Sequence, residues 1–183
     1  MNDGAILMPR SVVENLSTER QRHLPDETGG FLIGLRRGKH IEVTDATYQG
    51  PTDRATRYSF ERLDPGHERK AAAAWEGRDG LASIIGDWHS HPVGYAEPSG
   101  TDRHAWRVLA ASVKAPVIGI IMADRGPPGV FLTGWTRPLL HLRQCVLIEE
   151  TADELVFAPR ASTVAGLRDW RFPPGLKKSL WRR

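Results

Sequence analysis

The stretch that decides the fold reads Trp88-His89-Ser90-His91-Pro92-Val93-Gly94-Tyr95-Ala96-Glu97-Pro98-Ser99-Gly100-Thr101-Asp102. It follows a short apolar run at residues 81–85, whose branched side chains and flanking glycine indicate a buried strand. Alternate residues of a strand project from one face, so His89 and His91 are expected to point their imidazoles at one place.

A loop and a helix are expected to follow these two histidines. Gly94 and Pro98 are typical of a loop, and Ser99 is a good N-cap for a helix whose first turn contains Asp102. The helix would return the Asp102 carboxylate towards the end of the strand. Two neutral imidazoles and one carboxylate then predict a zinc site with three protein ligands and an open fourth position.

The spacing of these residues is more informative than the two histidines alone, because an isolated His-x-His usually binds no metal. The pattern resembles the JAMM motif of the JAB/MPN-domain metalloproteases, which is His-x-His, seven residues, then Ser-x-x-Asp; residues 92–98 supply the seven. A second segment, Glu27-Thr28-Gly29-Gly30-Phe31-Leu32-Ile33-Gly34, resembles the catalytic glutamate and glycine-rich strand of the same family. The resemblance covers roughly residues 5–136.

The resemblance implies both a fold and a mechanism. The fold is α/β, a single JAB/MPN-like domain with a mixed β-sheet flanked by helices in a cytidine-deaminase-like layout. His89, His91 and Asp102 would hold Zn²⁺, Glu27 would act as general base, and Ser99 would stabilise the oxyanion. A nucleophilic role for Ser99 is disfavoured, because no general base is implied for it.

Two further carboxylates lie close to this motif in the sequence. Asp87 falls on the same face of the predicted strand as the histidines and could accept a hydrogen bond from a ligand imidazole. Glu97 lies in the predicted loop, where solvation is the simpler explanation and a role as ligand or base is the alternative. On the helix, His104 is expected at the surface rather than as a fourth ligand.

The resemblance also implies a substrate class. Active JAB/MPN proteins cleave after the C-terminal glycine of a ubiquitin-like protein, and small prokaryotic members accompany activating and conjugating enzymes, including those of antiphage defence operons. A zinc-dependent isopeptidase of deubiquitinase type is therefore predicted. The alternatives are a RadC-like protein associated with DNA, a peptidase that trims sulfur-carrier proteins, and an inactive scaffold. Nucleic acid is the less favoured partner, because the segment around Glu27 matches the peptidase branch better.

Composition sets the class of protein. The chain has 183 residues, 40% hydrophobic and 26% charged, as in an ordinary single globular domain. No apolar run approaches the ~20 residues of a membrane span, and no signal peptide is recognisable, so a cytoplasmic location is predicted. The single Cys145 lies in an apolar run and is expected to be a buried, inert thiol.

Charge is distributed unevenly along the chain. Residues 159–183 contain seven Lys or Arg residues and one Asp, so they carry +6 of the formal net charge of +3 and leave −3 on the remainder. The predicted division is a JAB/MPN-like metallopeptidase domain at residues 1–158 and a basic C-terminal tail at residues 159–183. The tail is either a docking segment for a partner or polyanion, or a solvated, partly disordered extension.

The remaining elements follow from periodicity and from breaker residues. Helices are predicted from Ser11 to residue 22, at residues 64–75 and from Ser99 to residue 113. Strands are predicted at residues 5–8, 31–35, 41–48, 57–61, 81–85, 116–122, 130–135, 142–149 and 154–157. Trp75, Trp106 and Trp135 are expected in the core.

Overall fold

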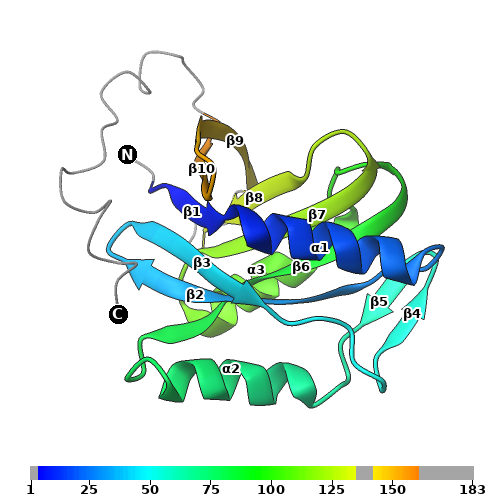
Figure 1. Cartoon of the computed structure of the whole chain (residues 1–183), viewed down its shortest axis with the longest axis horizontal. Helices are drawn as coiled ribbons and strands as arrows, with labels where there is room; N and C mark the ends of the chain where they lie inside the picture. The colour runs from blue at the N-terminus through cyan, green and yellow to red at the C-terminus, as the bar shows by residue number, and fades with distance from the viewer. Residues whose placement is uncertain (1–3, 135–141, 161–183) are drawn as a thin grey trace.

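The computed structural model describes residues 4–134 and 142–160. Within them, eight strands form one closed barrel, and helices pack on its outside (Figure 1). The strands, in barrel order, are β1 (Ile6–Pro9), β10 (Glu154–Pro159), β9 (Leu142–Glu150), β8 (Gly129–Thr133), β7 (Val117–Arg125), β6 (Ala82–Tyr95), β2 (Gly29–Arg37) and β3 (His40–Ala46). The helices are α1 (Arg10–His23), α2 (Gly66–Glu76) and α3 (Gly100–Val113), and a separate hairpin consists of β4 (Arg54–Thr56) and β5 (Ser59–Glu61).

The prediction of a mixed sheet with helices packed on it was correct, but the closure of the sheet into a barrel was not predicted. Strand pairs β6–β7 and β1–β3 are parallel, and the other neighbours in the barrel are antiparallel. Ile6 of β1 pairs with Phe157 of β10 on one side and with Ile41 of β3 on the other, which closes the barrel. Closure satisfies backbone groups that would otherwise be exposed at two sheet edges.

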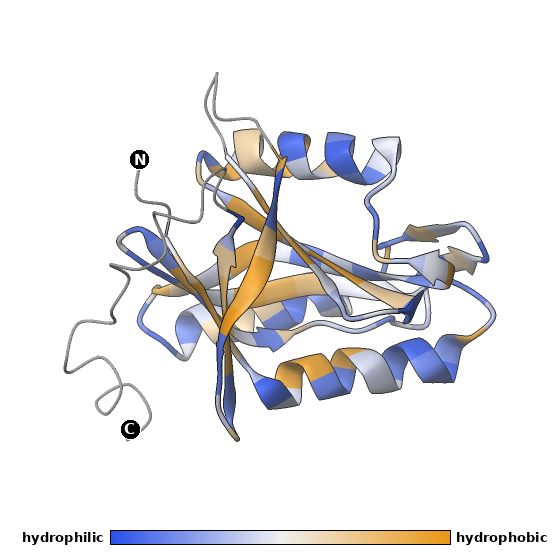
Figure 2. Cartoon of the chain, turned by 90° about the horizontal axis from the view of Figure 1, so that it is seen from above, coloured by the Kyte–Doolittle hydropathy of each residue, from blue (hydrophilic) through white to orange (hydrophobic). Residues whose placement is uncertain are grey.

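The barrel core follows the alternation of side chains along each strand. Ile118, Ile120 and Met122 of β7 point into the barrel, whereas Val117 and Ile121 form a second cluster beneath α3. A strand that is apolar on both faces is expected at a central position with cover on both sides. Figure 2 shows apolar residues concentrated along the strands, whereas the helices carry a mixture of apolar and polar residues.

Helix α1 starts at Arg10, one residue before the predicted start at Ser11. Its N-cap residue is Pro9, which makes no side-chain capping hydrogen bond, and Arg10 is the first helical residue. The chain passes directly from β1 into the helix, so proline occupies the cap position and Ser11 lies inside the first turn. Val12 and Leu16, four residues apart on one face of the helix, are buried against the barrel.

The prediction that three tryptophans lie in the core was confirmed for one of them and wrong for another. Trp106 is 1% exposed, as predicted, but Trp75 is 54% exposed and the prediction of a core position was wrong. Helix α2 is rich in alanine and packs on the barrel through a narrow face, so Trp75 lies on its outer side against Gly80. Trp135 lies outside the described residues. Cys145 is buried in the barrel core, as predicted.

The described residues end at Arg160, so the structure does not test the predicted boundary at residues 158/159. The basic tail therefore stays a prediction, and most of its residues lie outside the described part of the chain. None of the helices in the described ranges has the length and apolar character that a membrane span requires.

Candidate metal centre

The strand that carries the two histidines is longer than predicted. Strand β6 continues through His89 and His91 to Tyr95, because it is paired on both edges: antiparallel to β2 and parallel to β7. Its side chains alternate. Trp88 points into the barrel core and donates its Nε1–H to the Thr47 carbonyl at 2.8 Å, whereas the histidines point to the opposite face.

Helix α3 begins with a reciprocal capping box. The Ser99 hydroxyl accepts a hydrogen bond from the Asp102 backbone N–H at 3.2 Å, and Oδ2 of Asp102 accepts one from the Ser99 N–H at 2.6 Å. The predicted cap at Ser99 is therefore confirmed. Because the cap holds the Asp102 side chain against the first turn, its carboxylate faces back towards β6.

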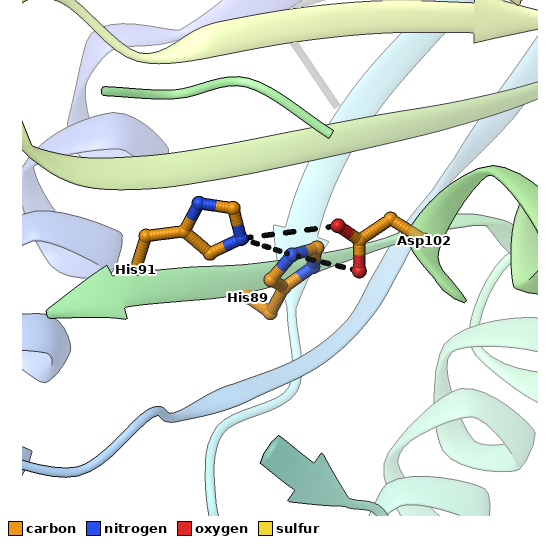
Figure 3. A group of neighbouring side chains, drawn as sticks. All are labelled: His89, His91 and Asp102. Atoms are coloured by element: carbon orange, nitrogen blue, oxygen red, sulfur yellow. Dashed lines mark hydrogen bonds and ion pairs between the residues drawn. The ribbon is translucent and has the colours of Figure 1, made fainter. Parts of the chain in front are cut away.

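The three predicted ligands converge on one point (Figure 3). Nε2 of His89 lies 3.3 Å from Oδ1 of Asp102, Nε2 of His91 lies 3.8 Å from Oδ2, and the two Nε2 atoms lie 3.2 Å apart. In a tetrahedral zinc site with bonds of about 2.0–2.2 Å, donor atoms are about 3.3–3.6 Å apart. The donor set and its spacing therefore fit zinc, and no other such cluster occurs among residues 4–134 and 142–160.

Hydrogen bonds and neighbouring charges orient the ligand side chains and shift their pKa values. Nδ1 of His91 lies 3.4 Å from the Tyr95 carbonyl oxygen, which can only accept, so this contact directs the lone pair of Nε2 into the site. Burial opposes the charge on Asp102, but donors from His89 and Ser99 outweigh it and lower the carboxyl pKa. Burial also opposes a charge on His89, but Asp102 outweighs it and raises the imidazole pKa.

Glu27 is placed by the pairing of β2 with β6. The residue that follows it, Thr28, exchanges hydrogen bonds with Ser90, and continuing this register puts Glu27 beside His91. Burial raises the pKa of Glu27 to about 7; His89 opposes the shift and Asp102 adds to it. The carboxyl group can therefore both accept and release a proton near neutral pH.

The glycine pair after Glu27 explains how β2 lies so close to its neighbours on both sides. A Cβ atom at Gly29 would lie 2.6 Å from the Trp88 carbonyl oxygen, and one at Gly30 would lie 2.0 Å from the Thr47 carbonyl oxygen. A side chain at either position would push β2 away from its neighbours. The glycines are thus needed for Glu27 to stand next to the ligand strand.

All five predicted site residues line one cavity of about 400 Å³. The β4–β5 hairpin forms one wall through Tyr58 and Phe60, and α3 forms another through Trp106. The backbone N–H of Glu27 donates to the Thr56 carbonyl at 2.8 Å, which ties this residue to the hairpin. A larger cavity, of about 690 Å³, lies between the start of α1 and the β9–β10 turn and contains none of the five.

Several neighbours of the motif differ from expectation or were missed. Asp87 lies on the ligand face, but its described hydrogen bonds go to Trp106 and Arg62 rather than to a ligand imidazole, so the predicted contact was wrong. Sequence reasoning missed the role of Arg62, which no motif marks. Glu97 is exposed and outside the metal cavity, and His104 is exposed, as predicted.

Comparisons with known proteins agree with the motif resemblance. Residues 9–136 match the family described as prokaryotic homologs of the JAB domain. A protein of Pseudomonas aeruginosa named CD-NTase/cGAS isopeptidase is 39% identical over 98 residues, which are 52% of this chain and 62% of that relative. A protein of the same name from Vibrio cholerae is 37% identical over 63% of this chain and 74% of its own length. A probable metalloprotease of Sinorhizobium fredii is 29% identical over 79% of this chain and 89% of its own length.

The names of these relatives match the predicted class of enzyme, a hydrolytic metallopeptidase. The chain spans less than two thirds of the length of the Pseudomonas relative that it matches. Among solved structures, a protein of Desulfitobacterium hafniense has the same fold, with a TM-score of 0.57 at 20% identity over 80% of this chain and 95% of that one. The chain therefore belongs to the family of prokaryotic homologs of the JAB domain.

Proposed function

We propose that this chain is a zinc-dependent isopeptidase that cleaves after the C-terminal residue of a conjugated protein. The observation that carries the proposal is that the carboxyl group of Glu27 lines the same cavity as the three ligand atoms of His89, His91 and Asp102. A metal site without a base could be structural, whereas a metal site beside a titrating carboxyl group is equipped for hydrolysis.

The ligands would be Nε2 of His89, Nε2 of His91 and the carboxylate of Asp102. Zinc bound there would polarise a water molecule and lower its pKa towards about 7. The buried imidazole of His89 and the pairing of Asp102 with its own helix cap hold the donors in place before metal arrives. Little rearrangement is then required on binding.

Glu27 would move the proton during the reaction. Its carboxylate accepts a proton from the attacking water, whose oxygen forms a bond to the scissile carbonyl carbon. The same proton then passes from Glu27 to the leaving amine nitrogen as the carbon–nitrogen bond breaks. Such acid–base catalysis is typically worth about 10²–10⁴-fold in rate.

Ser99 is suited to stabilise the oxyanion. Its hydroxyl oxygen accepts the capping bond from Asp102, which leaves the hydroxyl hydrogen available to donate. The side chain is exposed and lines the metal cavity. A donor aimed at the developing negative charge would lower the barrier without contacting the metal.

The substrate proposal has two sources. The motif resemblance implies the C-terminal glycine of a ubiquitin-like protein, or a conjugate made by cognate activating and conjugating enzymes. The names of the relatives point instead to CD-NTase/cGAS proteins, which agrees with the antiphage defence role that the motif resemblance implies. We propose conjugates of a CD-NTase as the first substrates to test and ubiquitin-like conjugates as the second.

A cleavage assay tests the proposal. Zinc-loaded protein is incubated with a CD-NTase or ubiquitin-like protein joined through its C-terminus either to a lysine side chain or to a peptide extension. Release of the intact C-terminus, abolished by a chelator, is the expected result. Cleavage of the peptide extension alone would favour precursor or sulfur-carrier processing. Absence of cleavage from both kinds of substrate would contradict the proposal.

A further inference from the structure

Asp87 joins three parts of the metal cavity. It lies on β6 two residues before His89, and it is 5% exposed. Its Oδ1 accepts a hydrogen bond of 2.5 Å from Nε1–H of Trp106 on α3, and its Oδ2 pairs with the guanidinium of Arg62, which follows β5. One buried carboxylate thus connects the ligand strand to both walls of the cavity.

The contact with Trp106 fixes the helix that carries Asp102. Trp106 lies one turn after Asp102, so the two side chains occupy the same face of α3. The indole lies against Gly119 of β7, where a Cβ atom would come within 2.1 Å of the ring, and it stacks on Phe131 at 5.5 Å. Because the indole fits this slot closely, its N–H is directed at Asp87, and this hydrogen bond adds a directional restraint to the packing that positions α3.

The contact with Arg62 fixes the other wall. The guanidinium carbon lies 5.1 Å from the Phe31 ring centre and 6.0 Å from that of Phe60, so Arg62 is held between β2 and the hairpin. Its Nε is buried and has no hydrogen-bond partner in the described residues. The pairing with Asp87 is therefore the main polar restraint on this side chain, and it ties the residue that follows β5 to the ligand strand.

We propose that Asp87 is a positioning residue that holds α3, through Trp106, and the β4–β5 hairpin, through Arg62, at fixed distances from the ligand strand. The contact with Trp106 controls how closely the Asp102 carboxylate approaches the two histidines, and hence the metal affinity. The contact with Arg62 controls the shape of the substrate side of the cavity, and hence the Michaelis constant. The second part rests on the proposed function, whereas the first requires only that the site binds metal.

The two contacts of Asp87 can be removed one at a time by substitution. Trp106→Phe keeps an aromatic ring beside Gly119 but removes the donor, and Arg62→Met keeps an apolar stem beside Phe31 but removes the guanidinium. Asp87→Ala removes both contacts. His104→Ala, on the exposed face of α3 two residues before Trp106, is the matched control.

Zinc affinity, measured by competition with a chelator and without substrate, is the first readout. Trp106→Phe and Asp87→Ala are expected to weaken zinc binding about 10–100-fold, the usual effect of losing a residue that orients metal ligands. The double variant Trp106→Phe/Asp87→Ala should bind zinc no more weakly than Asp87→Ala, because Asp87→Ala already lacks the contact that Trp106→Phe removes. Cobalt-loaded variants should show an altered visible spectrum, which a loss of fold stability alone would not produce.

The second readout is steady-state cleavage. Arg62→Met is expected to raise the Michaelis constant while zinc affinity stays within about 2-fold of wild type, the spread expected of a change that spares the ligands. Wild-type zinc affinity in folded Trp106→Phe and Asp87→Ala would overturn the proposal, as would additive losses in the double variant. Absence of cleavage by a zinc-binding wild type would contradict the proposed function alone. A wild-type chain that binds no zinc would overturn both.

Discussion

The backbone N–H of Thr28 donates a 2.9 Å hydrogen bond to the buried hydroxyl of Ser90, and the Ser90 N–H donates to the Thr28 carbonyl at 2.8 Å. Thr28 follows Glu27, and Ser90 lies between His89 and His91. The segment that carries Glu27 and the segment that carries the two histidines are more than sixty residues apart in sequence. They are therefore joined by residues directly next to the site residues themselves. The side chain of Ser90, which is outside the predicted ligand set, thus positions the segment that carries Glu27.

Ser90→Ala tests the connection between Thr28 and Ser90. The substitution leaves the buried N–H of Thr28 without a partner, which should cost about 1–3 kcal/mol of stability. It also loosens the segment that carries Glu27, so turnover is expected to fall while zinc affinity is kept. Ser83→Ala, at the other end of the β2–β6 pairing, is the control and should leave turnover unchanged. Equal turnover in both variants would show that Ser90 does not position Glu27.

The metal content of the protein tests the ligand set. Elemental analysis should find about one zinc per chain, as a three-ligand site predicts. Asp102→Asn retains an oxygen that can accept the capping bond from Ser99 but loses the charge, so zinc affinity and activity should fall while the helix remains. Addition of zinc should raise the melting temperature of wild type more than that of the variant. An equal rise in both would exclude Asp102 as a ligand.

The raised pKa of Glu27 predicts how the stability of the zinc-free protein depends on pH. The carboxyl group ionises near 4.5 in the unfolded chain but near 7 in the folded protein, because burial disfavours its charge. Between these values the unfolded chain has released a proton that the folded protein keeps, so stability falls as pH rises through the window. Glu27→Gln has no carboxyl group at this position, so its stability should not fall for this reason.

Denaturant unfolding in the presence of a chelator measures the effect. The free energy of unfolding of Glu27→Gln minus that of wild type should be larger at about pH 8 than at about pH 5. The comparison between two variants cancels the titration of groups that both share. A difference that does not change with pH would mean that the ionised Glu27 is not destabilised by burial.

Gly119→Ala tests the slot beneath Trp106. The added methyl group would meet the indole ring, which is rigid and enclosed, so α3 must shift outward. Such overpacking typically costs about 1–3 kcal/mol, and the shift should carry Asp102 away from the histidines and weaken zinc binding. Gly100→Ala, at a position with open space around it, is the control. Retention of wild-type zinc affinity in Gly119→Ala would show that the helix tolerates the displacement.

The local elements of the site could be predicted because they depend on residues close in sequence. Alternation along a strand places His89 and His91 on one face, and Ser99 and Asp102 form a capping box within a single turn. The closeness of Glu27 to the ligands was expected from the family resemblance alone. Its physical cause, the pairing of Thr28 with Ser90, involves two strands whose register the sequence does not specify.

The parts that were missed depend on distant contacts. Closure of the barrel requires β1 to pair with β3 and β10 at once, and neither pairing leaves a local pattern. The bonds of Asp87 to Arg62 and Trp106 join residues 25 and 19 positions apart. Trp75 was expected in the core because tryptophan is usually buried, but the shallow packing of α2 leaves it exposed, and residue type does not report how closely a helix packs.

The turnover of Glu27→Gln, measured together with its zinc content, tests the central claim most directly. The substitution is nearly isosteric and removes the titrating group while leaving His89, His91 and Asp102 intact. The account predicts one zinc per chain, a folded protein and cleavage slowed by about 10²–10⁴-fold, the usual worth of acid–base catalysis. A zinc-loaded variant that cleaves the conjugate at the wild-type rate would contradict it.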